Sequence, residues 1–492
     1  MNSTSRRFVQ HLVLCSLTLL VLVPFIACSP PTEIPARSNI LLITIDTLRA
    51  DHLSSYGYPR QTSPVIDRLA NEGVRFDQVS VQWPKTGPSF ASIFTATYPK
   101  NNGIVRKVGI PLPLEFRMLA EELRAQGYGT HAVVANGAVS ADFYFDQGFD
   151  SYVESWRVEE EPGLDPTGAE AVNRRVKEIL PKIDRQRPFF LWVHYLDPHF
   201  PYTPPGEWAD RFQNDEWFDP STKLLIDRSK NKIDMVKIGA SQILDGRDDL
   251  AFYVARYDAE IAYNDAKLGE LLEHLDDEGL MKNTLTALTS DHGESLGEHY
   301  YNFDHGRFGF QTCVRVPLIL HYPGVFLPRV DENPVELIDL APTFLEVAGV
   351  ELAEGRWMQG TSLSSRLVDG SGSESAAAFA FSEAGYAQDE KWQRIVRDRR
   401  YKLVESREGG EQRWMTGEVG KRFALYDLEN DPEETKNLAD ERPEELDRLR
   451  KVLRRWLRED FDALVDTDAT GAGGREMGED TREQLKALGY LN

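Results

Sequence analysis

Short apolar runs alternate with amphipathic stretches along the first 350 residues of the chain. The runs are short and rich in β-branched residues, which predicts strands buried on both faces. We expect these strands at 39–45, 129–135, 189–193, 284–289 and 316–320. The stretches between them carry apolar residues at helical spacing and predict helices at 63–72, 112–126, 169–180, 249–276 and 335–347. This alternation predicts an α/β fold with a large, mainly parallel sheet sandwiched by helices.

The pattern changes near residue 365. Residues 369–374 are rich in Gly and Ser, as in a linker. Short strand-like runs follow at 377–382, 392–396, 401–404 and 423–427. A charged helix is expected next, at 443–457, so the sequence predicts a small C-terminal α+β domain with an antiparallel sheet.

These changes of pattern divide the chain into a main domain and a small domain. We place the main domain at 38–365 and the small domain at 376–460. Residues 465–492 then form a tail that is flexible by composition up to residue 480 and ends in a short helix at 483–491.

The first 28 residues have the features of an export signal. Arg6 and Arg7 precede an apolar run, 12–27, that is short for a membrane span. The run ends Phe-Ile-Ala-Cys28, which is similar to the lipobox of bacterial lipoproteins, where the Cys is lipidated. We expect export to the periplasm or cell envelope, with membrane contact only through Cys28 and a tether at 29–37. Simple cleavage and an uncleaved anchor are the alternatives.

The charge balance bears on the partners of the protein. The formal net charge is −23 at pH 7, which argues against a nucleic-acid partner, because phosphate backbones need basic patches. An acidic protein that handles anionic esters needs a local cation to receive them. A bound metal ion would supply that cation.

Groups that bind metals or carry protons follow three of the predicted strands. Asp46 follows the first strand, the segment from His194 to His199 follows 189–193, and Asp291 and His292 follow 284–289. Ligands of parallel α/β sheets bind outside the carboxyl ends of the strands, so we expect these side chains to converge. His305 lies in a further Asp-His-Gly cluster before the strand at 316–320.

The stretch 83–98 predicts a short helix with Pro88 in its first turn. Thr86 would lie at the N-terminus of this helix, where unpaired N–H groups and the helix dipole hold an anion such as phosphate or sulfate. From this stretch alone, an ordinary Thr cap is the better explanation, because such caps are common.

Seven strings in the main domain resemble the sulfatase family, which belongs to the alkaline phosphatase superfamily. They read NILLITIDTLRADHLSSYG, TGPSFASIFTATYP, FFLWVHYLDPHFPY, LTSDHGESLGEH, FDHG, RVPLILHYPG and VELIDLAPTFLEVAGV. The later segments RRYKLV and FALYDLENDPEETKNLA resemble the C-terminal subdomain of the family. The resemblance runs in order over 38–460 and implies an alkaline-phosphatase-like fold. It also implies metal-dependent hydrolysis of a sulfate, phosphate or phosphonate ester.

The resemblance also implies roles for individual residues. Asp46, Asp291 and His292 match metal ligands, and Thr86 falls on the nucleophile, which also contacts the metal. His199 matches a His that contacts the ester, and His305 lies where the family places a residue that binds the anion or protonates the leaving group. Lys85, beside the nucleophile, would offset the charge of the bound anion. His194 and Asp197 receive no role.

This donor set suits one divalent ion, Zn²⁺ or Mn²⁺, with Ca²⁺ less favoured.

The chain departs from the family at the nucleophile. Formylglycine forms from Cys or Ser in the motif Cys/Ser-X-Pro-X-Arg, and here these positions hold Thr86 and Phe90. Oxidation of a Thr side chain gives a ketone and not an aldehyde, so we expect no formylglycine. Release of a plain Thr ester needs a second attack at sulfur or phosphorus, which favours phosphoryl-type esters.

Two other functions stay open. Thr47 stands where the family has a second Asp, and His292 stands where it has Asn. The resulting set resembles the phosphoethanolamine transferase and lipoteichoic-acid synthase branch, so one alternative is an exported transferase acting on a glycan or lipid. The other is a catalytically degenerate binding protein.

Overall fold

The computed structural model describes residues 34–105, 109–158, 163–229, 237–350, 358–367, 378–386, 391–407, 421–459 and 475–491. The predicted export signal with Cys28 and the Gly/Ser-rich linker at 369–374 lie outside these ranges. Within them, no helix has both the length and the hydropathy needed to cross a bilayer.

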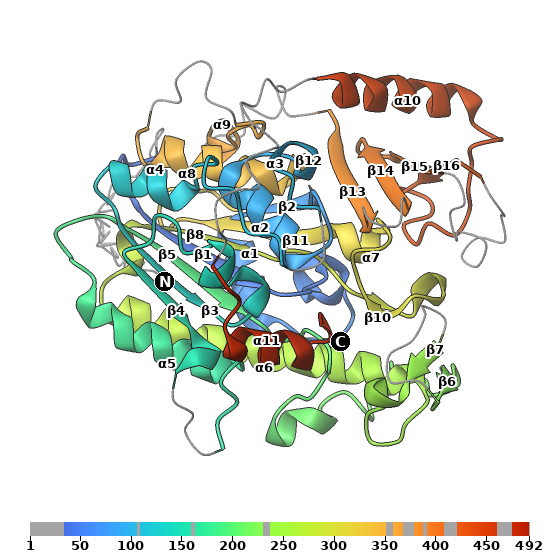
Figure 1. The fold of residues 1–492 in the computed structure, drawn as a ribbon, viewed down its shortest axis with the longest axis horizontal. Helices are drawn as coiled ribbons and strands as arrows, with labels where there is room; N and C mark the ends of the chain where they lie inside the picture. The colour runs from blue at the N-terminus through green and yellow to red at the C-terminus, as the bar shows by residue number, and fades with distance from the viewer. Residues whose placement is uncertain are drawn as a thin grey trace, which may run out of the picture.

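A large sheet lies at the centre of the molecule (Figure 1). In the described residues it has eight strands in the order β12-β2-β11-β8-β1-β5-β3-β4. Their bounds are β1 Asn39–Ile45, β2 Val74–Ser80, β3 Gly129–Val134, β4 Ser151–Glu154, β5 Phe189–Tyr195, β8 Thr284–Thr289, β11 Arg315–His321 and β12 Arg329–Glu336. Strand β11 runs antiparallel to both of its neighbours, β2 and β8, and the other pairs are parallel. The sheet is therefore mixed but mostly parallel, as predicted.

Helices cover both faces of this sheet. Side chains of β1 alternate between two buried cores: Ile40 and Leu42 face one core, and Leu41 and Ile43 face the other. The first core includes α2 (Thr86–Thr95), α4 (Leu119–Ala125) and α8 (Leu340–Val347). The second includes α1 (Pro64–Glu72), α5 (Ala169–Ile179) and the long α6 (Leu250–Asp277). The central strands are buried on both faces, which explains their continuous apolar sequence.

Three helix predictions differ from the structure in their bounds. The expected helix 112–126 is helical over α4, because Pro111 and Pro113 precede it and the Leu112 N–H bonds to the Phe143 carbonyl. The expected helix 335–347 begins at Leu340, since residues up to Glu336 belong to β12. The terminal helix, α11, spans Glu479–Ala487, four residues earlier than predicted.

A second sheet forms the small domain at the upper right of Figure 1. Its described strands are β13 (Ala380–Tyr386), β14 (Lys391–Arg397), β15 (Tyr401–Ser406) and β16 (Phe423–Asp427), antiparallel in chain order. Helix α10 (Pro443–Arg458) packs on it through Leu449, Leu453 and Trp456. This arrangement agrees with the predicted antiparallel sheet and helix.

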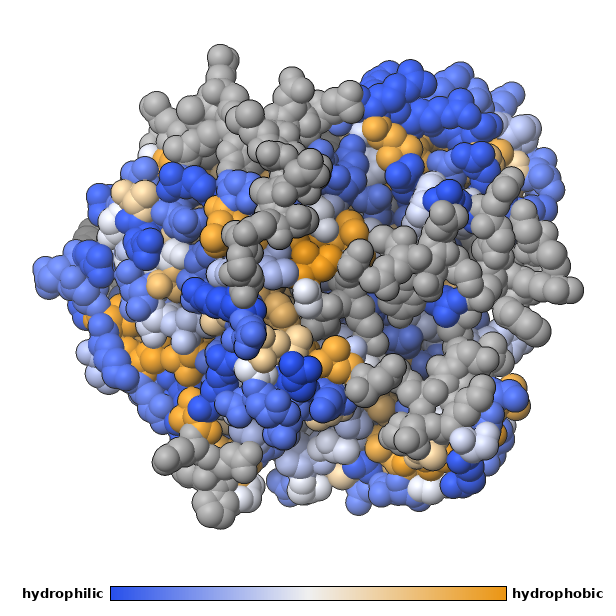
Figure 2. All heavy atoms as spheres, in the orientation of Figure 1, coloured by the Kyte–Doolittle hydropathy of each residue, from blue (hydrophilic) through white to orange (hydrophobic). Residues whose placement is uncertain are grey.

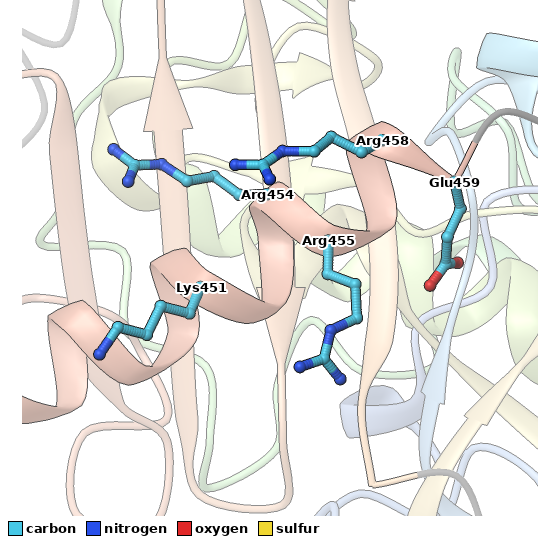
Figure 3. A pocket seen from close by; sticks show the side chains of 5 residues that line it. All are labelled: Lys451, Arg454, Arg455, Arg458 and Glu459. Carbon is cyan, nitrogen blue, oxygen red and sulfur yellow. The ribbon is translucent and has the colours of Figure 1, made fainter.

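The outer side of α10 is strongly hydrophilic (Figure 2), and the helix carries Lys451 and several Arg residues. Lys451, Arg454 and Arg458 extend on one side of the helix and Arg455 on the other, around a shallow hollow (Figure 3). This hollow lies on the small domain, whereas the groups that the sequence singles out follow strands of the large sheet. We therefore place the candidate site at the large sheet.

Candidate active site and metal centre

Three adjacent strands of the large sheet end at the same level. In the register of the sheet, Ile45 at the end of β1 pairs with Tyr195 of β5, and Thr44 pairs with Thr289 of β8. Asp46 follows β1 directly, and Asp291 and His292 follow β8 after one residue. The sheet therefore brings these three side chains together, as the sequence predicts.

Asp46, Asp291 and His292 form a buried cluster suited to a metal ion. One ligand atom from each lies within 4.8 Å of the others, and the described residues contain no second group of three such side chains. All three residues are fully buried. His292 Nε2 lies 3.3 Å from Asp291 Oδ2 and 3.9 Å from Asp46 Oδ1.

Each ligand is held by its other polar atom. His292 Nδ1 donates a hydrogen bond to the Gly293 carbonyl (2.9 Å), which leaves the Nε2 lone pair facing the two carboxylates. Asp291 Oδ1 accepts from the backbone N–H groups of His292 (2.9 Å) and Thr47 (3.3 Å). The backbone of Thr47 has a positive φ of 55°, a conformation that β-branched residues rarely adopt.

The oxygens that face the cluster centre fit a cation. Asp46 Oδ1 and Asp291 Oδ2 have no hydrogen-bond partner among the described residues, although both are buried. Buried carboxylates of this kind are costly unless a positive charge balances them. Two carboxylate oxygens and one imidazole nitrogen at short mutual distances are a donor set for a divalent metal ion.

The protonation of these groups fits the same interpretation. Burial, together with the charge of Asp46, raises the pKa of Asp291 well above its usual value. Burial lowers the pKa of His292 to about 4, so its imidazole is neutral and can act as a ligand. Burial alone would raise the pKa of Asp46, but the neighbouring histidines, His194 first, lower it to about 2. A cation at the centre would restore the ionised form of Asp291.

Asn136, just after β3, and His194, in β5, hold Asp46 in position. Asn136, which follows β3, donates from Nδ2 to Asp46 Oδ2 (2.5 Å), and its own Oδ1 accepts from the Ala138 N–H. His194 Nε2 lies 3.6 Å from the same Asp46 oxygen, and its Nδ1 bonds to Thr44 Oγ1 (3.0 Å). Asn136 received no role from sequence, although its place directly after a buried strand was an available signal.

Asp197, which received no role from sequence, lies away from this cluster. Its side chain accepts a hydrogen bond from the Ala169 N–H at the first residue of α5 (2.9 Å). Burial raises the pKa of Asp197 to about 7. The residue therefore anchors a helix N-terminus.

Thr86 is the first residue of α2 and faces the cluster. Its Oγ1 lies 3.3 Å from His292 Nε2, and the residue is almost fully buried. Ser89 Oγ, one turn later, donates to the Asp291 carbonyl (2.6 Å) and so fixes α2 against the end of β8. The helix N-terminus therefore points at the cluster, with the dipole and free N–H groups that favour an anion.

Phe90 stands where the formylglycine motif has Arg. Its ring packs against Trp192 and His194, with centroid distances of 4.9 Å to each, and is fully buried. A guanidinium at this position would be placed among aromatic rings. Phe90, which replaces the Arg of the family motif, is therefore part of the buried core next to the site.

Two further histidines lie beside the cluster. The rings of His292 and His305 have a centroid distance of 4.1 Å, and those of His199 and His305 one of 5.5 Å. His199 Nδ1 donates to the Phe200 carbonyl (2.7 Å), while His305 Nδ1 bonds to Glu294 Oε1 (3.3 Å). Glu294 received no role from sequence, and in the structure it orients His305.

Lys85 precedes Thr86 and is buried beside these histidines. A Cβ atom at Gly306 would collide with the Lys85 side chain, so this Gly, with its positive φ, lets the lysine pass. The charge of Lys85 contributes to the lowered pKa of His292, after burial. The structure thus places the lysine where it adds positive charge to the site.

Tyr490 completes the site from the far end of the chain. Its hydroxyl lies 3.2 Å from Thr86 Oγ1 and 3.1 Å from His199 Nε2. Nothing in the sequence singled out this residue, because the segment around it reads only as a short helix.

Family models match most of the chain. The model described as "Sulfatase" matches residues 38–350, and the one described as "N-sulphoglucosamine sulphohydrolase, C-terminal" matches residues 297–461. Among curated relatives, an arylsulfatase of Clostridium perfringens is 25% identical over 472 residues, covering 85% of this chain and 94% of its own. A multifunctional alkaline phosphatase superfamily protein of Trinickia caryophylli is 26% identical, covering 82% and 91%.

Solved structures share the fold. A structure in complex with D-glucosamine-2-N,6-O-disulfate superposes with a TM-score of 0.66 at 22% identity, covering 85% of this chain and 97% of the other. The phosphonate monoester hydrolase of Agrobacterium radiobacter gives a TM-score of 0.64 at 23% identity, covering 85% and 96%. With the family model matched over well more than half of its length, the chain belongs to the sulfatase family of ester hydrolases, within the alkaline phosphatase superfamily.

Proposed function

We propose that this protein hydrolyses sulfate, phosphate or phosphonate esters with Thr86 as the nucleophile and one divalent metal ion as cofactor. The observation that carries the proposal is the position of Thr86. Its hydroxyl lies at a helix N-terminus, 3.3 Å from His292 Nε2 in the Asp46, Asp291 and His292 cluster. A nucleophile, an anion-binding helix end and a candidate metal centre thus meet at one point.

The metal is the one component that the chain itself does not supply. A divalent cation held by Asp46, Asp291 and His292 would lower the pKa of the Thr86 hydroxyl and offset charge on the ester oxygens. One imidazole and two carboxylates favour Zn²⁺ or Mn²⁺ over Ca²⁺, which prefers oxygen ligands.

The residues of the chain carry the transfer itself. The Thr86 hydroxyl loses its proton to solvent, and the resulting alkoxide attacks sulfur or phosphorus in line while the bond from that atom to the alcohol oxygen breaks. The α2 N-terminus and Lys85 stabilise the charge on the remaining oxygens. His199 or His305, in the imidazolium form, gives its proton to the departing alcohol oxygen.

A second attack then releases the group from Thr86. Water gives a proton to the now neutral histidine and attacks the same sulfur or phosphorus atom, and the Thr86 oxygen leaves. A formylglycine hydrate could instead expel sulfate by breaking a C–O bond, a path that a Thr ester lacks. This difference favours phosphate and phosphonate esters over sulfate esters. The fold shared with a phosphonate monoester hydrolase is compatible with that choice.

The test is a screen of the purified full-length protein. Nitrophenyl sulfate, phosphate mono- and diesters and a phosphonate ester are offered with Mn²⁺, Zn²⁺ or Ca²⁺, and Thr86→Ala is compared with wild type. We expect turnover of at least one ester and a loss on the order of 10³-fold or more in Thr86→Ala. Thr435→Ala, at an exposed threonine of the small domain, is the matched control.

Two results would contradict the proposal. Full activity in Thr86→Ala would exclude the nucleophile. Absence of turnover with every ester and every metal, together with no tight metal binding, would favour the degenerate binding protein. Transfer of the group to an added glycan or lipid alcohol in preference to water would favour the transferase.

We also propose that the protein is exported and held at the membrane through a lipid on Cys28. The support is the signal-like sequence that ends at this residue. Fractionation of cells that express wild type or Cys28→Ala tests it: the wild type should sediment with membranes, and the variant should be soluble or remain unprocessed. An unchanged distribution and unchanged mass would contradict lipidation.

A further inference from the structure

The C-terminal segment of the described chain, residues 475–491, returns to the large domain. In Figure 1, α11 and the C-terminus lie against this domain, well away from α10 of the small domain. Gly489, with a φ of 71°, follows α11 and turns the chain so that Tyr490 enters the active site. We refer to residues 475–491 as the C-terminal segment.

The segment is docked by specific contacts to the loop that follows β3. Gln484 Nε2 donates to the Ala135 carbonyl (2.7 Å), and Gln484 Oε1 accepts from the Gly137 N–H. A Cβ atom at Gly137 would collide with Gln484, so this Gly permits the contact. Leu485 beside it is fully buried in the core formed with α2 and α4.

Further contacts involve the same loop and Arg157, which follows β4. Arg157 donates to Thr481 Oγ1 (2.6 Å), the Gly478 N–H donates to Asp142 Oδ2 (3.0 Å), and Arg475 pairs with Asp146 (2.8 Å). This loop also supplies Asn136, which binds Asp46. The C-terminal segment therefore packs on an element of the catalytic site itself.

The Tyr490 hydroxyl lies in the space through which the reacting group of an ester would have to approach Thr86. It lies 3.2 Å from Thr86 Oγ1 and 3.1 Å from His199 Nε2. In a reactive complex the atom under attack lies about 3–3.5 Å from the nucleophile. One of its oxygens must also lie within hydrogen-bond reach of the acid that protonates it. The phenol and the ester cannot both fill this space.

We propose that the C-terminal segment is a removable plug that competes with the substrate through Tyr490. This inference rests on the proposed function, because it takes Thr86 and His199 as the groups that meet the ester. With the plug in place the site cannot accept an ester. The apparent affinity for substrate is therefore the intrinsic affinity multiplied by the fraction of molecules in which the plug is open.

Kinetics of point variants of the full-length protein test the plug. Tyr490→Ala removes the phenol, and Thr481→Ala weakens the docking at its contact with Arg157, away from the residues that flank Asn136. Both should lower the KM for a nitrophenyl ester by roughly tenfold at unchanged kcat, and Tyr490→Phe should have a smaller effect because the ring remains. Lys486→Ala, on the exposed side of α11, is the matched control and should equal wild type.

Hydrogen exchange provides a readout that needs no turnover. Inorganic phosphate, added to the metal-loaded protein, should speed amide exchange in peptides that cover 479–491 and should bind roughly tenfold more tightly to Tyr490→Ala. Exchange that is unchanged or slowed by phosphate would overturn the plug. A fall in kcat in both Tyr490→Phe and Tyr490→Ala would overturn it as well, since the phenol would then act in the reaction.

The two proposals fail in different ways. Phosphate binding does not need the Thr86 hydroxyl, so displacement of the plug can be measured in Thr86→Ala. If Thr86→Ala keeps full activity, the nucleophile is wrong, and the exchange experiment still decides whether Tyr490 leaves when an anion binds.

Discussion

Two regions of very different origin meet at Thr86. One is the cluster at the strand ends, Asp46, Asp291 and His292, which the central sheet assembles from residues directly after β1 and β8. The other is the C-terminal segment, which reaches Thr86 through Tyr490 from about 400 residues away in sequence. The first region is fixed by the core of the sheet, and the second by hydrogen bonds to a loop and by burial of Leu485. The cluster provides the groups for the chemistry, and the C-terminal segment controls access to them.

The largest expected effect breaks the strand-end cluster. Asp46→Asn removes one carboxylate charge from a fully buried ligand set, so the cation loses a strong ligand. We expect a loss of hydrolysis on the order of 10³-fold and a loss of bound metal. Metal analysis of the purified protein beside the ester assay checks both, with Asp440→Asn at an exposed carboxylate of the small domain as the control. Full metal content with full activity would remove Asp46 from the site.

Asn136 links the two regions, because it binds Asp46 and its loop carries the C-terminal segment. Asn136→Ala leaves Asp46 Oδ2 without its 2.5 Å hydrogen bond. Partners of this kind are worth about 10–100-fold in metal affinity or activity, so we expect a loss in that range. Titration of the apo-protein with Mn²⁺ measures it, and the exposed Asn430→Ala serves as the control. An unchanged affinity would reduce Asn136 to a loop residue.

The strand-end cluster could be predicted from sequence because each part has a local signal. The apolar run 39–45 is β1 to the residue, and Thr284–Thr289 is β8 to the residue. Once both are placed in one parallel sheet, the polar residues that follow them must converge. Thr86 likewise begins a helix, as the sequence predicts.

Other parts had no such signal. Strand β12 includes Asp331 and Pro334, so it does not read as an apolar run, and its pairing with β2 decides its structure. Tyr490 reads as one more apolar residue near a terminal helix, and only the docking of Gln484 and Leu485 in the folded chain gives it a role. Contacts between residues this far apart in the sequence leave no pattern in the local sequence.

Loosening the C-terminal segment should affect access without loss of the cluster. Leu485→Ala creates a cavity at a fully buried position of the segment. A Leu→Ala substitution at a buried position costs about 2–5 kcal/mol, and here it destabilises the docked form of the segment. We expect unchanged metal content and kcat and faster amide exchange over 479–491, measured by mass spectrometry. Loss of bound metal in this variant would show that the two regions are not separable.

The smallest expected effect concerns a buried acid at the junction of the two sheets, which belongs to neither region. Glu336 Oε1 accepts from the Phe381 N–H of β13 (2.9 Å), and its Oε2 accepts from the Tyr98 hydroxyl (2.8 Å). Burial, together with the charge of Asp339, raises the pKa of Glu336 to about 8. The folded protein therefore holds a proton here between pH 4.5 and 8 that the unfolded chain has lost, so the free energy of unfolding falls as pH rises through this window.

The contribution of Glu336 to the slope of the free energy of unfolding against pH should reach about 1.4 kcal/mol per pH unit, the limit for a single proton. Denaturant unfolding at pH 5, 6, 7 and 8 measures it for wild type and for Glu336→Gln, in which the slope from this group is absent. Equal slopes in the two proteins would show that Glu336 is ionised in the fold. Because this junction carries no ligand of the cluster and no contact of the C-terminal segment, metal affinity at a fixed pH should be the same in both proteins. A change in that affinity would mean that the small domain, and not the sheet edge alone, holds the metal ligands in position.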